Sequence, residues 1–229
     1  MLISVISCPM MVIFGFTFNR KSPINSNQFW FKFMSNGYSF MFGLTANAIM
    51  AQYTKLFIGR LRPFFIDICR PVSTINGVEY DFYNMTDCSM LHNVYITDYE
   101  CRQSQHSETL LNIVEQSQMS FYSAHTSLIT YSAIFLCLLI SDKIKSRKLL
   151  SLKLFLIMSL VLVAIWIGHT RVTDHWHHWE DVAVGHLVGV ITAIGCWTVF
   201  DRHSKYGTCQ VENQQNGSNR INDDDDDNL

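Results

Sequence analysis

Long uncharged apolar stretches limit what this chain can fold into. Five stretches contain no Lys, Arg, Asp or Glu, the first of them interrupted by Pro9: residues 2–18, 35–54, 119–140, 154–168 and 182–200. At about 1.5 Å per residue, each of the last four can cross, or nearly cross, a bilayer core of roughly 30 Å as a helix. Only 16% of the residues are charged, compared with roughly 25% in soluble domains. The sequence therefore predicts an all-α, multi-span integral membrane bundle with five spans.

Basic residues in the connecting segments predict how these spans are oriented. Residues 19–34 contain three Lys or Arg, and the short segment 141–153 contains five. Short basic loops stay on the cytoplasmic side, so the loop 64–118 is expected to face the exterior or a lumen. We expect a membrane domain over residues 1–202. The polar residues 203–229, which include a run of five aspartates, are expected to form a disordered acidic cytoplasmic tail.

The loop 64–118 contains two further features of a non-cytoplasmic segment. Asn84-Met85-Thr86 is an N-glycosylation sequon, whereas the sequon at Asn216 lies in the tail and is expected to stay unmodified. Cys69, Cys88 and Cys101 lie in the same loop, in a compartment that permits disulfides. Three cysteines leave one over, and the sequence leaves the pairing open.

A first polar cluster lies at the outer end of the second stretch. Lys55 is followed seven residues later by Arg62 and then Pro63. Seven residues are close to two helical turns, so both cations are expected to point the same way on a helix that Pro63 ends after Arg62. Two converging cations suit a phosphate. The alternative is a basic belt that snorkels at the membrane edge.

A second polar cluster opens the next stretch, at Ser120–Ser127. Small residues at a helix N-terminus present backbone N–H groups and the positive end of the helix dipole, an arrangement that binds phosphate. Ser123 adds a hydroxyl, and His125 could protonate a leaving oxygen. Taken alone, an ordinary N-cap beside an interfacial histidine fits this cluster equally well.

A third polar cluster contains Arg171, His177 and Asp181, within the stretch Gly168–Gly185. Residues four apart share a helix face, so Asp181 is expected to lie against one imidazole nitrogen of His177 and leave the other free to attack. The stretch also fits a metal site, with candidate ligands Asp174, His175, His177, His178 and Asp181. A metal does not explain why Lys55, Arg62 and Arg171 should converge there, because cations repel it.

Taken in order, the three clusters resemble the signature of the type-2 phosphatidic acid phosphatase superfamily. The matching motifs are Lys55-x6-Arg62-Pro63, Ser123-Ala124-His125 and Arg171-x5-His177-x3-Asp181. The flanking Gly59-Arg60-Leu61 and Ser120-Phe121-Tyr122 are similar to the animal lipid phosphate phosphatases, a group that includes the fly Wunen proteins. The resemblance covers residues 1–202 and implies the helical membrane fold of this family.

The resemblance also implies roles and substrates. His177 would attack phosphorus and form a phosphohistidine. Asp181 would orient the imidazole of His177, and His125 would protonate the leaving alkoxide. The phosphoryl oxygens would be held, without a metal or other cofactor, by Lys55, Arg62, Ser123, the N–H of Ala124, and Arg171. Substrates would be phosphatidate, lysophosphatidate, sphingosine 1-phosphate and related lipid phosphates at the extracellular or lumenal face of, we expect, the plasma membrane. The family allows a homo-oligomer, and the charge balance gives no sign of nucleic acid binding.

The chain departs from the family pattern at three points, of which Ala124 and the number of spans leave alternatives open and Thr170 keeps the hydroxyl. Ala124 replaces a glycine, Thr170 replaces a serine, and five spans stand where the family has six, as if the first were missing from a fragment or short isoform. A member that binds lipid phosphates without hydrolysing them is therefore a second hypothesis. A metal-dependent membrane enzyme built on the histidine cluster is the third.

Overall fold

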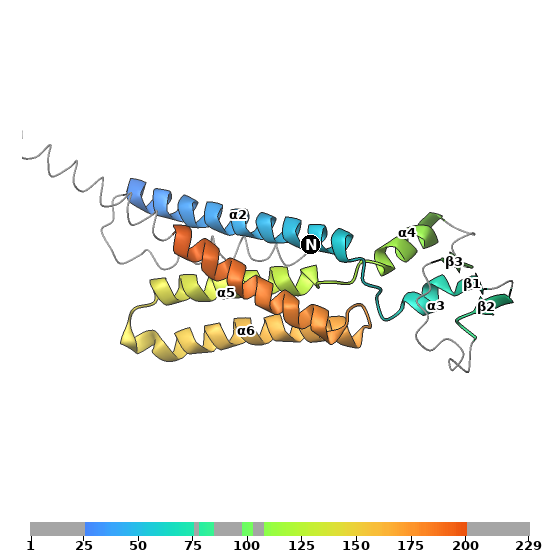
Figure 1. The fold of residues 1–229 in the computed structure, drawn as a ribbon. Helices are drawn as coiled ribbons and strands as arrows, with labels where there is room; N and C mark the ends of the chain where they lie inside the picture. Colours follow the sequence, from blue (N-terminus) through green and yellow to red (C-terminus); the bar gives the residue numbers. More distant parts are fainter. Residues whose placement is uncertain (1–25, 76–77, 85–97, 103–107, 201–229) are drawn as a thin grey trace, which may run out of the picture. The chain divides into compact units, whose positions relative to one another are not determined.

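The protein is mostly helical in the computed structural model, which describes residues 26–75, 78–84, 98–102 and 108–200 (Figure 1). Four long helices account for most of these residues: α2 (Ser26–Ile58), α5 (Ala124–Lys143), α6 (Leu150–Thr173) and a final helix (Trp179–Phe200). A short 3-10 turn, Arg147–Leu149, precedes α6. The predicted helical membrane fold is thus confirmed as a class.

Three helices in the described ranges are long and apolar enough to cross a membrane: Ala124–Lys143, Arg147–Thr173 and Trp179–Phe200. They contain most of the predicted spans 119–140, 154–168 and 182–200. The predicted span 35–54 lies within α2, which is longer but is not among those three. The predicted span 2–18 and tail 203–229 lie outside the described residues, so the count of five spans stays a prediction.

The end of α2 differs from the sequence prediction. Gly59 has a φ of +59°, in the left-handed region that glycine adopts without strain. Its N–H donates to the carbonyl of Lys55 at 3.1 Å, which closes the helix after Ile58. The expectation that Pro63 would end the helix after Arg62 is therefore wrong, and Arg62 lies beyond the helix instead of two turns along it.

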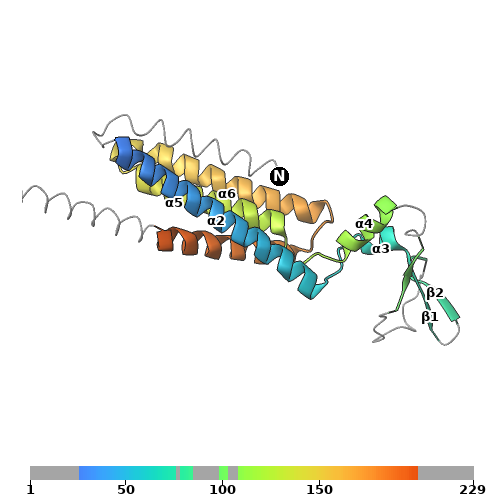
Figure 2. The same cartoon turned by 90° about the horizontal axis from the view of Figure 1, so that it is seen from above.

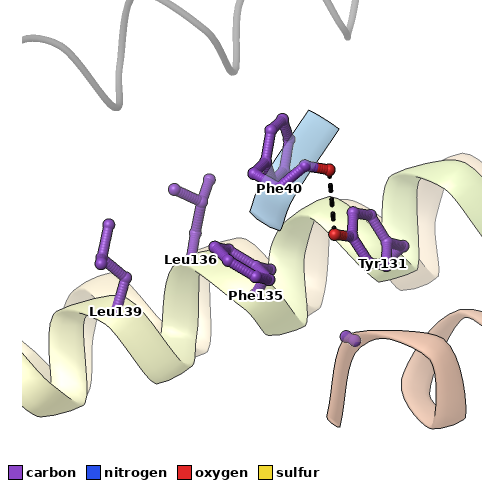
Figure 3. Packing of buried hydrophobic residues seen from close by; sticks show 6 residues of the cluster. Phe40, Tyr131, Phe135, Leu136 and Leu139 are labelled. Carbon is purple, nitrogen blue, oxygen red and sulfur yellow. Dashed lines mark hydrogen bonds between the residues drawn. The ribbon is translucent and has the colours of Figure 1, made fainter. Parts of the chain in front are cut away.

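The contacts within the chain divide the described residues into two units. The first consists of the described residues up to 47, residues 128–162 and the described residues from 188 onward. The second consists of the described residues in 48–127 and 163–187. The first unit contains an aromatic core (Figure 3). Phe40 of α2 and Phe135 of α5 meet edge to face with their ring centroids 5.4 Å apart. The hydroxyl of Tyr131 donates to the carbonyl of Phe40 at 3.0 Å. Alanine 193 of the final helix completes this buried cluster.

The second unit contains a small folded segment where the sequence indicated only a loop. It comprises α3 (Phe65–Cys69), a sheet of order β2-β1-β3 and α4 (Glu108–Ser117). The strands are β1 (Pro71–Ile75), β2 (Val78–Asp81) and β3 (Glu100–Cys101). Strand β1 pairs antiparallel with β2 (Figure 2) and also with β3. A disulfide joins Cys69 to Cys101, which resolves the pairing that the sequence left open.

Two backbone hydrogen bonds bring the ends of this folded segment together. The N–H of Arg62 donates to the carbonyl of Ser117, and the N–H of Ser120 donates to the carbonyl of Arg60, both at 2.8 Å. Residues 60–62 and 117–120 therefore lie side by side as a backbone clamp. The clamp positions the residues that follow α2 next to those that precede α5.

Candidate active site

The structure brings the three polar clusters together within the second unit. Lys55 interacts electrostatically with Arg62, and both cations interact with His177. His125 lies within electrostatic range of Lys55, Arg171 and His177. These five side chains come from the end of α2, the backbone clamp, the start of α5, the end of α6 and the loop after it. Such a group of three cations and two imidazoles is suited to a phosphoryl dianion.

His177 lies in the loop between α6 and the final helix, with 2% of its surface exposed. The expectation that His177 and Asp181 share one helix face is wrong, because the helix begins only at Trp179. The chain turns at His175, whose φ is +59°. The N–H groups of Trp176 and His177 then both donate to the carbonyl of Arg171 at 3.1 Å. This tight turn at the end of α6 carries the imidazole inward.

Asp181 lies in the first turn of the final helix and is completely buried. Its Oδ1 accepts a hydrogen bond from Nη1 of Arg60 at 2.9 Å, and its Oδ2 accepts from the hydroxyl of Ser120 at 2.5 Å. The backbone N–H of His178 also donates to Oδ2, at 3.2 Å. Burying a carboxylate is unfavourable unless its oxygens are paired, and here both oxygens are paired.

The contact between Asp181 and His177 is indirect. Oδ2 of Asp181 lies 3.8 Å from Nδ1 of His177, too far for a hydrogen bond. The hydroxyl of Ser120 lies between them, 3.3 Å from Nδ1 and 2.5 Å from Oδ2. The sequence predicted a direct contact between the carboxylate and the imidazole, whereas in the structure the hydroxyl of Ser120 lies between them.

Ser123 caps the N-terminus of α5. Its buried hydroxyl accepts hydrogen bonds from the N–H and the hydroxyl of Thr126, at 3.5 and 2.9 Å. Its N–H donates to the carbonyl of Asp181 at 3.1 Å, which links α5 to the final helix. Among the described non-glycine residues only Arg70 and His175 have positive φ. Ala124 therefore occupies the glycine position of the family motif without backbone strain.

Aromatic and acidic neighbours hold two of the cations. The guanidinium of Arg62 lies over the ring of Trp176, 5.0 Å from its centroid, and 5.9 Å from that of Phe64. Nη2 of Arg171 lies 3.2 Å from a carboxylate oxygen of Asp174 on the next turn. Sequence analysis gave no such role to Trp176. Both cations are thus pre-positioned, and Arg171 shares its charge with an exposed acid.

Burial sets the ionisation of the central imidazole. Desolvation lowers the pKa of His177, and the positive charges of Arg62 and Lys55 lower it further, whereas Asp181 acts in the opposite direction. The neutral, nucleophilic form of His177 is therefore favoured. On the other side of Asp181, the hydrogen bond to Glu180 raises the pKa of Arg60, so that guanidinium stays charged.

The donors of the alternative metal site are engaged separately. Nδ1 of His175 lies 2.9 Å from the carbonyl of Thr173, Asp174 pairs with Arg171, and the ring of His178 contacts the carbonyl of Leu61. Within the described ranges, no three His, Cys, Asp or Glu side chains form a group that could hold a metal ion. The histidine-rich sequence thus spreads its side chains in several directions.

Sequence reasoning assigned no role to Arg60 or Ser120, both of which contact Asp181. Each lies beside a residue that the motifs include: Arg60 two positions before Arg62, and Ser120 three before Ser123. A second arginine and a second serine in such short segments were the available signals. Only the backbone clamp reveals that these two residues meet.

Comparisons with known proteins agree on one family. A profile of the PAP2 superfamily matches residues 36–205. Phospholipid phosphatase 1 of Rattus norvegicus is 31% identical over 156 residues, which cover 68% of this chain and 49% of the relative. Phospholipid phosphatase 2 of Mus musculus is 34% identical over 161 residues, covering 70% and 50%. A putative phosphatidate phosphatase of Drosophila melanogaster is 29% identical over 155 residues, covering 68% and 38%.

The chain thus spans about half the length of the phospholipid phosphatases it matches. No solved structure matches it.

Proposed function

Because this chain belongs to the PAP2 superfamily, we propose that it is an integral membrane phosphatase that hydrolyses lipid phosphate monoesters through a phosphohistidine on His177. The observation that carries this proposal is a buried imidazole, that of His177, whose pKa is lowered by desolvation and by the neighbouring cations Arg62 and Lys55. His177 and Lys55 also interact with His125, a candidate proton donor. Fixed cations around a nucleophile stabilise the charge that develops on a transferring phosphoryl group.

The proposed reaction has two steps. One imidazole nitrogen of His177 attacks phosphorus, the bond from phosphorus to the lipid oxygen breaks, and His125 gives the leaving alkoxide its proton. Water then attacks the phosphohistidine, His125 takes the proton from that water, and inorganic phosphate leaves. Lys55, Arg62 and Arg171 hold the phosphoryl oxygens in both steps, with Ser123 and the N–H of Ala124 as further donors.

We propose phosphatidate, lysophosphatidate, sphingosine 1-phosphate and ceramide 1-phosphate as the substrate class. Each has one phosphate monoester and an acyl or alkyl chain that can remain in the bilayer. The names of the relatives, phospholipid phosphatases and a putative phosphatidate phosphatase, support this class. The site residues lie in or next to the ends of long helices, which supports a substrate that enters with its chain still in the membrane.

We place the site at the extracellular or lumenal face, with the plasma membrane as the expected location. The basic segments 19–34 and 141–153 support a cytoplasmic position for the opposite ends of the helices. The Cys69–Cys101 disulfide supports an oxidising compartment for the segment beside the site. Asn84 is exposed in the same segment, as a glycosylation acceptor requires.

The proposal is tested by phosphate release from a panel of these lipids by the purified protein in detergent with excess EDTA. The His177→Ala variant is expected to lose turnover and to form no acid-labile phosphoenzyme from labelled substrate. His169→Ala removes an exposed histidine of α6 and serves as the matched control. Lipid phosphate binding without release would favour the non-hydrolysing alternative, and activity that EDTA abolishes would favour the metal-dependent one.

A further inference from the structure

A chain of polar contacts runs from the protein surface to the buried imidazole. It begins at Glu180, whose Oε2 lies 2.6 Å from Nη2 of Arg60, and continues through Nη1 of Arg60 to Oδ1 of Asp181 at 2.9 Å. Oδ2 of Asp181 accepts from Ser120, and Ser120 contacts Nδ1 of His177. The proposed roles of His177 and Asp181 leave Arg60 and Ser120 without a function.

The geometry fixes the direction of the hydrogen bonds at Ser120. An ionised carboxylate only accepts hydrogen bonds, so the single hydroxyl proton of Ser120 points to Asp181. The serine oxygen can then only accept from Nδ1 of His177, which must carry its proton there. The other ring nitrogen, Nε2, is left unprotonated. Ser120 therefore selects the tautomer of His177 that can attack phosphorus.

Arg60 acts on the opposite oxygen of Asp181. The two terminal nitrogens of its guanidinium form ion pairs with Glu180 and Asp181, which are adjacent in the first turn of the final helix. With Arg60 on Oδ1, the carboxylate can present only Oδ2 to Ser120. The carbonyl of Arg60 also accepts the N–H of Ser120 at 2.8 Å, so the backbone clamp places both residues at Asp181 together.

We propose that Ser120 and Arg60 are positioning residues for the phosphoryl transfer, Ser120 as the hydroxyl that relays Asp181 to Nδ1 of His177 and Arg60 as the clamp that orients Asp181. This inference rests on the proposed phosphatase function for its kinetic consequence. The tautomer of His177 is a separate consequence, because it follows from the hydrogen bonds alone and needs no turnover.

The first test is Ser120→Ala, assayed with a short-chain phosphatidate and followed by 15N NMR of protein labelled at histidine. The expected result is a kcat lowered roughly 10- to 100-fold, by analogy with the partners that orient a metal-ligating histidine, with KM changed less than about threefold. The His177 signal, assigned with His177→Gln, is expected to lose its pure Nδ1–H form. Ser117→Ala is the matched control, since that serine is equally buried and its hydroxyl donates to the carbonyl of Val114 within α4. Its backbone carbonyl, which accepts the N–H of Arg62, is retained in the alanine variant.

The second test changes Arg60, which lies near the surface end of the chain of contacts, so it needs no substitution in the buried core. Arg60→Gln removes the charge and leaves a shorter polar side chain, and Arg60→Lys restores the charge. We expect kcat to fall about tenfold in Arg60→Gln, with partial recovery in Arg60→Lys. Arg102→Gln is the control, because Arg102 also bridges two acids, Glu79 and Asp81, at a surface site away from His177.

The possible results distinguish the proposed phosphatase function from the proposed positioning roles of Ser120 and Arg60. A wild-type protein without phosphatase activity would refute the proposed function while leaving the tautomer measurement to decide the relay. An active wild type, inactive His177→Ala, and Ser120→Ala with normal kcat and an intact Nδ1–H signal would overturn the relay alone. Arg60→Gln with the kcat of Arg102→Gln would overturn the clamp.

Discussion

At the scale of single residues, the ionisation of His177 predicts how the activity depends on pH. Burial, Arg62 and Lys55 lower the pKa of His177, and its neutral form is the proposed nucleophile. The free enzyme should therefore keep its activity as pH falls through the ordinary histidine range near 6.5, and lose it only at lower pH. The acid limb of the kcat/KM profile measures this directly.

One substitution checks the cause of this shift. Lys55→Gln removes a cation that opposes protonation of His177, so the acid limb should move to higher pH. Lys55→Arg keeps the positive charge and is the control for the limb position, whatever either change does to the rate. A limb that stays in place in Lys55→Gln, or moves to lower pH, contradicts the electrostatic explanation.

The sequence predicted that the candidate site residues would converge, but not the contacts through which they do so. Lys55, Arg62, His125, Arg171 and His177 do come together, as their order and chemistry indicated. Arg60 and Ser120 were missed because their roles depend on a contact between segments about sixty residues apart, at the backbone clamp. Side-chain spacing within one segment carries no information about such a contact.

At the scale of elements, the final helix approaches the start of α5 at a glycine. A Cβ on Gly185 would lie 2.8 Å from the carbonyl oxygen of Ser123 and 3.2 Å from Cβ of Thr126. The backbone carbonyl cannot move without displacing the cap of α5. Gly185→Ala should therefore destabilise the protein by about 1–3 kcal/mol, as overpacking commonly does, and should also reduce the activity because Ser123 shifts.

Thermal unfolding in detergent and phosphate release measure the two effects. Gly195→Ala is the matched control, since no atom lies within 4 Å of the Cβ it would add on the same helix. Alanine is also the better helix former, so this control should be as stable as the wild type or more so. Equal unfolding temperatures for the two variants would argue against close packing at Gly185.

Helix ends show why element boundaries are hard to predict. The apolar stretches located α5, α6 and the final helix, because long uncharged runs have few other stable states in a membrane protein. Where each helix stops depends on single residues, as with the left-handed Gly59 at the end of α2. Pro63 gave a stronger sequence signal for a helix end than Gly59 did. The helix nevertheless ends at Ile58, four residues before the expected end at Arg62.

At the scale of the whole molecule, the proposed orientation predicts where the chain can be modified. Asn84 is exposed, and its side-chain nitrogen donates to Asp81 at 2.8 Å, so the acceptor lies at the surface of the folded segment. In a eukaryotic cell the protein should carry one glycan that Asn84→Gln removes. Asn216→Gln, at the tail sequon, should leave the electrophoretic mobility unchanged. A glycan lost with Asn216→Gln instead would reverse the orientation.

The family and helical class of the molecule could be read from the sequence, but the folded segment between α2 and α5 could not. Its strands are two to five residues long, and β3 pairs with β1 across about thirty residues of chain. Short strands held by a distant disulfide and by a neighbour far along the chain have weak local patterns. The cysteines and the sequon at Asn84 marked this segment as non-cytoplasmic in the sequence, but they did not indicate its strands.

The backbone clamp also affects how a protein of this kind can diversify. Because the chain leaves at Arg62 and returns at Ser117 within hydrogen-bonding distance, everything between those points forms a cassette with fixed ends. Lengthening such an excursion costs little entropy once its ends are joined. The proposed hydrolytic site can thus be combined with cassettes of different size and surface, while the residues on either side of the clamp stay the same.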